Sequence, residues 1–294
     1  MTGSNAHVLR LLQLLGHQDR IRFGVRDRII RRFCNPDVVD PSEFEVEFFG
    51  LKYKGNLNCY IDWMVYFYGA YQKYELFCLR DLLKNRARPV CFDIGANVGQ
   101  HSLFLSRYCD RVHAFEPYEL VRRQLELKIR HNDISNIVVH DVGLGQQDSQ
   151  LDYFAPRGCN TGTGSFVPSY ATDNNRLIGK LQVVDADRYI SGLGLAKIDL
   201  IKIDVEGYEK NVLLGLKDTL REYRPVLFME FSAETKHSFQ GEDEMMSMLP
   251  SNYGIKRVLT NRPRFAVLAN PGYTFSHFDF DVSGGNIVLS PSDQ

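Results

Sequence analysis

Six acidic side chains stand at or just after the ends of short apolar runs, at Asp93, Glu116, Asp141, Asp204, Glu206 and Glu230. If these runs are parallel strands, their carboxyl ends meet at one edge of a sheet, where ligands of such sheets bind. None of these end positions is a Lys or an Arg. A pocket with this charge would favour a cationic ligand and repel a pyrophosphate, and its carboxylates could also accept protons.

The stretch FDIGANVGQHS, which follows the first run, is a loop of the kind that lets backbone approach a ligand closely. Gly95, Asn97 and Gly99 alternate through it, and the G-x-G-x-x-G fingerprint of dinucleotide sites is absent. S-adenosylmethionine fits this pattern, because its sulfonium and ammonium are positive and it has no phosphate. Its ribose diol would be held by the carboxylate after the second strand, which is Glu116.

Strand and helix patterns alternate from Pro89 onward. Apolar strands are predicted at 90–94, 111–115, 136–141, within 199–207, and at 225–231, with a closing pair in YGIKRVL and GNIVLS near the carboxyl end. Helices are predicted between them, so the chain should form βαβ units and a mostly parallel sheet covered on both faces. Before Pro89, residues 46–57 predict a hairpin around Gly50 and Gly55, and an aromatic helical segment follows.

The segments FDIGANVGQHS, AFEP, NTGTGSF, LIKIDVEGYE and PVLFMEF, in this order, resemble the FkbM-type methyltransferases, a branch of the class I S-adenosylmethionine-dependent enzymes. The resemblance implies an α/β, Rossmann-like three-layer sandwich. Its sheet would have seven mostly parallel strands with the last one antiparallel, and here it would carry an N-terminal helical and hairpin extension. It divides the chain into a basic helical extension (1–45), a hairpin and aromatic lead-in (46–88) and a methyltransferase domain (89–294).

The same resemblance implies O-methylation of a hydroxyl group and a set of cofactor-binding residues. Glu116 and Pro117 would lie at the ribose and Asp141 and Val142 near the adenine. The remaining expected cofactor contacts are Asp93, Gly95, Ala96, Asn97, Gly99, His101, Ser102 and Asp204. The family usually has an acid directly after the tyrosine of a G-x-Y-E stretch, whereas this chain has Gln72 there and Glu75 three residues later.

A hydroxyl acceptor must lose its proton during methyl transfer, which calls for a base within hydrogen-bond reach. Asp204, Glu206 and Glu230 are the candidates, with Glu206 ahead of the others because the loop after the strand points toward substrate. His237, which follows the fifth strand, is a further candidate at neutral pH. The same carboxylates could alternatively hold Mg²⁺, although no compact cluster of ligands beyond these acids stands out, and no metal residue is assigned.

Three other segments each allow two interpretations. The polar stretch 157–166, with Asn160, Thr161, Thr163 and Ser165, is either a loop over the acceptor or a surface loop. The aromatic stretch 63–74 either roofs the active site or packs the lead-in helix onto the sheet. The arginine-rich amino terminus is either an amphipathic helix that contacts a membrane or partner, or a solvated helix that leans on the main domain.

Composition sets the remaining expectations. The 294 residues carry 35 basic and 36 acidic side chains, and this near-neutral balance gives no reason to expect a nucleic-acid partner. Six scattered cysteines without a Cys-x-x-Cys pair favour reduced thiols in a cytoplasmic protein, and no stretch is apolar enough to span a membrane. The expected partner is a small-molecule or glycan hydroxyl acceptor such as a sugar or polyketide. The alternatives are an NAD-dependent oxidoreductase and a non-catalytic binding module on the same fold.

Overall fold

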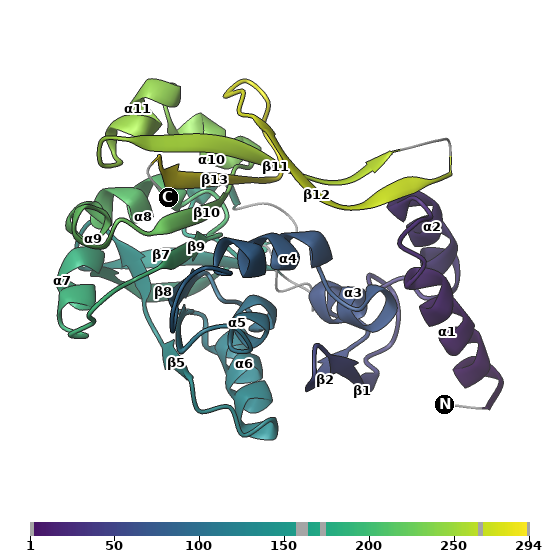
Figure 1. The fold of residues 1–294 in the computed structure, drawn as a ribbon. Coiled ribbons are helices and arrows are strands. Elements are labelled where there is room, and N and C mark those ends of the chain that lie inside the picture. The colour runs from purple at the N-terminus through teal and green to yellow at the C-terminus, as the bar shows by residue number, and fades with distance from the viewer. Residues whose placement is uncertain (1–2, 157–163, 171–174, 264–266, 293–294) are drawn as a thin grey trace.

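An eight-stranded sheet forms the centre of the protein, here described by a computed structural model that covers residues 3–156, 164–170, 175–263 and 267–292. The strand order is β12-β11-β13-β10-β9-β3-β4-β5 (Figure 1). The strands are β3 (Val90–Ile94), β4 (Arg111–Phe115), β5 (Ile137–His140), β9 (Leu200–Ile203), β10 (Val226–Glu230), β11 (Tyr253–Pro263), β12 (Ala269–His277) and β13 (Asn286–Pro291).

The directions of these strands confirm the predicted fold class. β3, β4, β5, β9 and β10 pair in parallel, whereas the last strand, β13, is antiparallel to both β10 and β11. The closing pair that the sequence predicts is therefore β11 with β13. β12 pairs antiparallel with β11 and adds an eighth strand at the sheet edge.

Alternating side chains of the central strands fill two apolar cores, one on each face of the sheet. Cys91 packs with α4 (Lys73–Leu82), α5 (Gln100–Leu105) and α6 (Glu119–His131). Phe92 faces the opposite core. The helices on that side are α7 (Ala186–Ser191), α8 (Glu209–Gly215), α9 (Lys217–Tyr223), α10 (Ala233–Ser238) and α11 (Glu242–Ser247). This burial on both faces explains why the strands are continuous apolar runs.

The N-terminal part forms a separate layer beside this sandwich. It contains α1 (Gly3–Gly16), α2 (Phe23–Phe33), the antiparallel hairpin β1 (Glu43–Phe48) and β2 (Leu51–Asn56), and α3 (Tyr60–Tyr68). The predicted hairpin is confirmed, with Gly50 at positive φ in its turn. Trp63 and Phe67 of α3 are fully buried in a cluster with Ile30 of α2. The three-part division of the chain stays a prediction.

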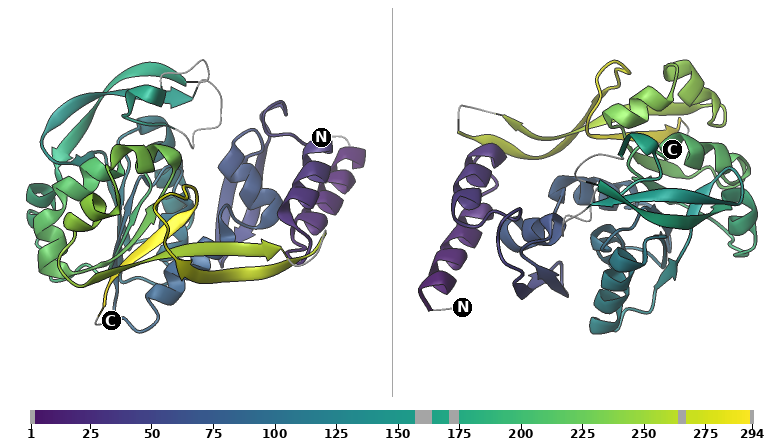
Figure 2. Two further views of the ribbon diagram at one scale, coloured as in Figure 1. Left: turned by 90° about the horizontal axis from the view of Figure 1, so that it is seen from above. Right: turned by 180° about the vertical axis from the view of Figure 1, so that it is seen from behind.

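A second, three-stranded sheet follows β5 and was not predicted. Its order is β6-β8-β7, with β6 (Gly143–Gly145), β7 (Ser149–Pro156) and β8 (Asn175–Asp185). β7 and β8 form a long antiparallel arm, and the short helix η2 (Pro168–Tyr170) lies between them in the chain (Figure 2). Within the described ranges, no helix has the length and apolar character needed to cross a membrane.

Candidate active site

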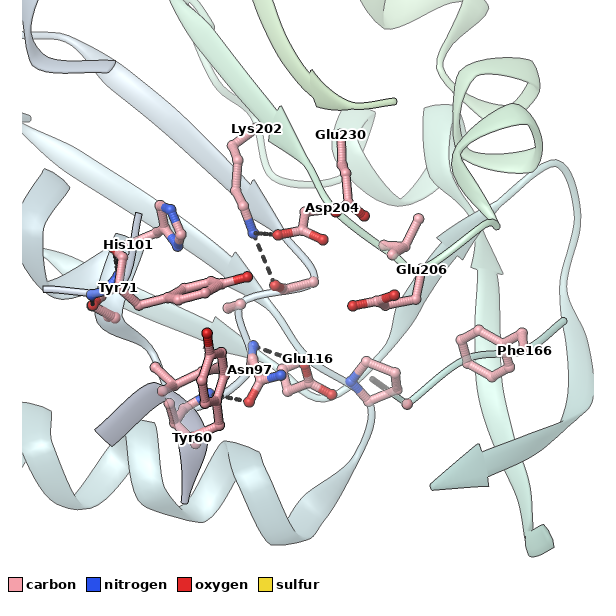
Figure 3. Close-up of a pocket in the computed structure, with 18 of the residues that line it drawn as sticks. Tyr60, Tyr71, Asn97, His101, Glu116, Phe166, Lys202, Asp204, Glu206 and Glu230 are labelled. Carbon is pink, nitrogen blue, oxygen red and sulfur yellow. Dashed lines mark hydrogen bonds and ion pairs between the residues drawn. The ribbon is translucent and has the colours of Figure 1, made fainter. Parts of the chain in front are cut away.

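A pocket of about 210 Å³ lies at the carboxyl ends of β3, β4, β9 and β10 (Figure 3). Its walls come from four parts of the chain: the glycine loop, the turns after the strands, the segment before β3 and the β7–β8 arm. The lining residues are Tyr60, Ile61, Tyr71, Gly95, Ala96, Asn97, Val98, Gln100, His101, Glu116, Pro117, Tyr153, Gly164, Phe166, Lys202, Asp204, Val205, Glu206 and Glu230.

Gly95 brings the loop after β3 against the turn after β9. Its φ is +80°, and a Cβ at this position would lie 1.9 Å from the carbonyl oxygen of Asp204. A side chain is therefore impossible here on both conformational and steric grounds. The two loops touch backbone to backbone, so the predicted cofactor loop and the predicted base loop have fixed relative positions.

All five backbone N–H groups from Gly95 to Gly99 already have acceptors. The amides of Gly95 and Ala96 donate to the Phe115 carbonyl at 3.0 Å each, and that of Asn97 donates to Glu116 Oε2 at 2.9 Å. The remaining two donate to the Asn97 side chain and to the Ala96 carbonyl. A phosphate-binding loop offers its amides to the anion. In this loop all five amides already donate within the protein, so the loop does not suit a pyrophosphate.

Glu116 is the carboxylate after the second strand, at the predicted ribose position. It is 5% exposed and also accepts a hydrogen bond from the Tyr118 amide at 2.8 Å. Burial raises the pKa of Glu116 to about 7, and the two backbone donors oppose this rise. The side chain lies in the pocket wall (Figure 3), where its remaining lone pairs could accept from a diol.

Lys202 is a basic neighbour of the acids, although none of the strand-end positions is a Lys or an Arg. It lies two residues before Asp204, inside β9, and its side chain reaches the strand ends. Its Nζ is 3.1 Å from Asp93 Oδ1 and 3.3 Å from Asp204 Oδ2. Despite burial, which lowers it, the pKa of Lys202 is raised by these two carboxylates. The pocket is therefore less negative than the row of acids implies.

Asp93 and Ser102 lie beneath the pocket rather than in its lining. Both are fully buried, and the Ser102 hydroxyl donates to Asp93 Oδ2 at 2.6 Å. With Lys202 on its other oxygen, Asp93 anchors the base of the site. Direct cofactor contact, which the sequence predicts for both residues, stays a prediction.

Asp204, Glu206 and Glu230 meet as predicted, with one carboxylate oxygen of each within 4.8 Å of the others. Burial first, and then the charge of Asp204, raise the pKa of Glu230 to about 10, so this side chain is protonated at neutral pH. Such a group could in principle hold a cation. Since the Lys202 ammonium already stands beside Asp204, we assign no metal to it.

The turn that carries Glu206 is held by hydrogen bonds from both sides. Glu206 has φ +52°, a left-handed conformation that is costly for a residue with a side chain. Glu209, which is fully buried, accepts from the amides of Val205 and Gly207. On the other side, the Ser165 hydroxyl donates to the Glu206 carbonyl at 2.6 Å.

Aromatic side chains complete the pocket, and two of them, Tyr71 and Phe166, lie in segments that the sequence analysis considered as covers of the site. Tyr60 and Tyr71 come from the N-terminal layer, and their hydroxyl groups point into the pocket (Figure 3). Gln100 fixes Tyr71, because its side-chain amide accepts from the Tyr71 N–H at 2.6 Å and donates to its carbonyl at 2.9 Å. Tyr153 of β7 and Phe166 close the opposite wall, with ring centroids 5.0 Å apart.

Tyr60 and Tyr71 bear on the two interpretations of the aromatic stretch. Tyr71, inside the 63–74 range, lines the pocket, whereas Trp63 and Phe67 are core residues. Each interpretation therefore holds for part of the segment. Of the predicted polar loop, Gly164 and Phe166 line the pocket, while residues 157–163, including Asn160, Thr161 and Thr163, lie outside the described residues.

Four other predicted site residues are absent from the described pocket lining. Asp141 is exposed beyond β5, and Val142 is buried in the core below it. Gly99 packs against α6, where a Cβ would lie 2.2 Å from the Leu125 side chain. His237 is exposed on α10, which makes it a poor candidate for the base.

His101 does line the pocket, although it is 6% exposed. Burial and the nearby Lys202 ammonium lower its pKa to about 3, so the ring is neutral. Its Nε2 has no hydrogen-bond partner among the residues that the structure describes.

The model of the FkbM methyltransferase domain matches residues 93–256, more than half of the chain. The chain belongs to the FkbM methyltransferase domain family. This FkbM domain contains the glycine loop, Glu116 and all three clustered acids. Tyr60 and Tyr71 lie before the matched region.

The proteins similar to the chain include two curated proteins and an FkbM methyltransferase of known structure. It is 33% identical to Methyltransferase 1 of Beauveria bassiana over 147 residues, which are 43% of this chain and 57% of that protein. It is 26% identical to the AMB antimetabolite synthetase AmbE of Pseudomonas aeruginosa over 228 residues, 64% of this chain and 11% of the synthetase. An FkbM methyltransferase structure from Methylobacillus flagellatus aligns with a TM-score of 0.41 and 20% identity, over 68% of this chain and 43% of that one.

The chain thus spans little more than half the length of one curated relative and about a tenth of the other.

Proposed function

We propose that the protein is an S-adenosylmethionine-dependent O-methyltransferase that acts on a hydroxyl group of a small molecule or glycan. The observation that carries this proposal is the glycine loop, in which all five amides already donate to acceptors within the protein. Glu116 lies in the wall of the same pocket. Such a site suits a nucleoside without phosphates. S-adenosylmethionine supplies, when bound, a methyl group already activated by a positive sulfur.

The residues of this chain would hold the reactants and take one proton. Glu116 would accept hydrogen bonds from the ribose, and the acids after β9 would face the positive sulfur. Glu206 is our candidate for the base. Glu230 holds a proton at neutral pH, which makes it a poorer proton acceptor. Alignment of the reactants and exclusion of water by Tyr60, Tyr71 and Phe166 would supply much of the remaining rate.

Calorimetric titration with S-adenosylhomocysteine and with NAD tests the cofactor assignment. We expect S-adenosylhomocysteine to bind and NAD not to bind. Glu116→Gln should weaken the binding by about 10- to 100-fold, because a hydrogen bond to a charged group contributes about 1.5–3 kcal/mol. Glu119→Gln, at an exposed residue of α6, is the matched control. Binding of NAD alone would overturn the assignment.

Release of S-adenosylhomocysteine with a panel of sugars and polyketide alcohols tests turnover. With an accepted substrate, Glu206→Gln should lower kcat by about 10²- to 10⁴-fold, the usual contribution of a general base. Its affinity for S-adenosylhomocysteine should stay within a few-fold of the wild type. Tight cofactor binding without turnover on any acceptor would instead favour a binding module.

A further inference from the structure

Helices α1 and α2 lie side by side at one end of the molecule, beside α3 and the outer end of β12 (Figure 2). Their inner faces are satisfied by packing: Leu12 of α1 and Ile30 of α2 are buried in one cluster with Trp63 and Phe67. These contacts fix both helices on the protein. The other faces of α1 and α2 therefore point toward solvent.

The outward faces carry large apolar side chains. Leu11 is 66% exposed, Leu14 59% and Phe33 67%. Leu11 and Leu14 are three residues apart on α1, and Ile29 and Phe33 four apart on α2, so each pair shares one face of its helix. Of fifteen such exposed apolar residues in the described chain, seven fall in this short segment: Val8, Leu11, Leu14, Phe23, Ile29, Phe33 and Val38. Scattered exposure is normal, but this concentration indicates a binding surface.

Exposed arginines stand among these apolar residues. Arg10 is next to Leu11 on α1, and Arg28 and Arg32 are one turn apart on α2 beside Ile29 and Phe33. Three acids of this segment pair with basic side chains, and one of them is Asp37, which lies 3.3 Å from Arg31. Asp27 pairs with Arg31, and Asp19 pairs with Arg26 and Lys73. The outward faces of the two helices thus combine apolar side chains with positive charge.

We propose that this α1–α2 face binds the surface of an anionic lipid bilayer. Leucine and phenylalanine side chains would enter the boundary between headgroups and acyl chains, and the arginines would contact lipid phosphates. A second copy of the same face fits less well, because a two-fold contact would bring arginines toward arginines. A bilayer supplies apolar contact and negative charge together. The inference rests on surface residues alone and is independent of the proposed methyl transfer.

Vesicle flotation tests this proposal with the full chain. Wild-type protein should float with phosphatidylcholine vesicles that contain roughly 30% phosphatidylglycerol, and much less with pure phosphatidylcholine. The triple variant Leu11→Gln, Leu14→Gln, Phe33→Gln should lower the partition constant at least about tenfold, given the apolar area lost. Arg28→Gln with Arg32→Gln should lower it too and reduce its salt dependence.

The matched control is Leu120→Gln, Leu127→Gln, Leu177→Gln, which removes apolar side chains of 51–55% exposure elsewhere on the molecule. It should bind vesicles as the wild type does. The proposal is overturned if wild-type protein does not bind the anionic vesicles, or if the control loses binding equally. A dimer in sedimentation velocity that only the α1–α2 triple variant abolishes would assign the face to a second copy. Calorimetry with S-adenosylhomocysteine on the same variants keeps this outcome separate from the cofactor assignment.

Discussion

The carboxyl groups near the pocket differ in whether they lie beside the Lys202 ammonium. This ammonium lies 3.1 Å from Asp93 Oδ1 and 3.3 Å from Asp204 Oδ2. Burial first, and then the negative charge of Asp204, raise the pKa of Glu75 to about 8 and that of Glu230 to about 10. Glu75 also accepts a hydrogen bond from Asn286 at 2.6 Å. At neutral pH the carboxyl groups of Glu75 and Glu230 therefore hold protons.

Glu230 should make the folded protein less stable as the pH rises. In the unfolded chain it ionises near pH 4.5, whereas the folded state keeps the proton up to about pH 10. The folded state thus binds more protons, and stability falls between these two values. Glu230→Gln mimics the protonated form. We expect it to be more stable than the wild type at pH 8.5, on the order of 1–3 kcal/mol, with the difference vanishing near pH 5.

Thermal unfolding of both proteins across this pH range measures the effect. Glu234→Gln, at an exposed residue of α10, is the control and should leave the pH profile unchanged. A constant difference between Glu230→Gln and the wild type at all pH values would contradict the assignment of the proton to Glu230.

The sequence placed Glu116, Asp204, Glu206 and Glu230 at one pocket because each follows an apolar strand. Lys202 was missed, although a lysine inside the apolar run LIKI carries a signal: a charged residue buried in a strand needs a partner. Whether Asp93 faced the ligand or the core could not be predicted, since a buried lysine from another strand decides it. Tyr60 joins the site through tertiary packing, which local patterns do not encode, whereas Tyr71 belongs to the aromatic stretch that one interpretation placed over the active site.

The parallel strands were the elements easiest to predict. β3 and β4 begin and end at the predicted residues, because strands covered on both faces are short apolar runs between turns. β8 and β12 were missed for the opposite reason. Most of their side chains are exposed or only half-buried, so their sequences show little apolar alternation. The arm formed by β7 and β8 is nevertheless the element that brings Tyr153 and Phe166 to the pocket.

The hydrogen bond from Ser165 should position Glu206 within the site. Ser165 is 1% exposed, bonds to Phe154 of β7 through both backbone groups, and donates its hydroxyl to the Glu206 carbonyl. Its loss would loosen the left-handed turn. Sinefungin carries an amine where S-adenosylmethionine carries the methylsulfonium, so its affinity relative to S-adenosylhomocysteine reports the nearby carboxylates. Ser165→Ala should reduce this preference about three- to tenfold.

Ser165→Thr keeps the hydroxyl and should restore the preference for sinefungin. Ser106→Ala removes a hydroxyl–carbonyl bond of similar length at the end of α5, away from the pocket lining, and should leave the preference intact. If all three variants keep the wild-type ratio of affinities, Ser165 has only a structural role.

The N-terminal layer is tied to the carboxyl-terminal strands at several points. The Ala269 N–H of β12 donates to the carbonyl of Arg20, between α1 and α2, at 2.8 Å. An isolated bridge also joins Ile21 to Leu268. Segments near opposite ends of the chain thus pack together, and Tyr60 of the N-terminal layer forms part of the pocket wall. We therefore expect the described chain to unfold as one cooperative unit.

Trp63 provides the measurement, because it is the single tryptophan and is fully buried in the N-terminal layer. Its fluorescence reports this layer, whereas far-ultraviolet circular dichroism reports the whole chain. Urea transitions followed by the two signals should coincide. An earlier fluorescence midpoint would show that the N-terminal layer opens by itself.

The contact of Gly95 with the Asp204 carbonyl leaves no room for independent adjustment of the two loops. A shift of the Gly95 loop on cofactor binding would therefore move the turn that carries Asp204, which faces the acceptor. Binding of the acceptor would likewise move the Gly95 loop. Affinity for either reactant should then depend on whether the other is present, with the same coupling free energy in both directions.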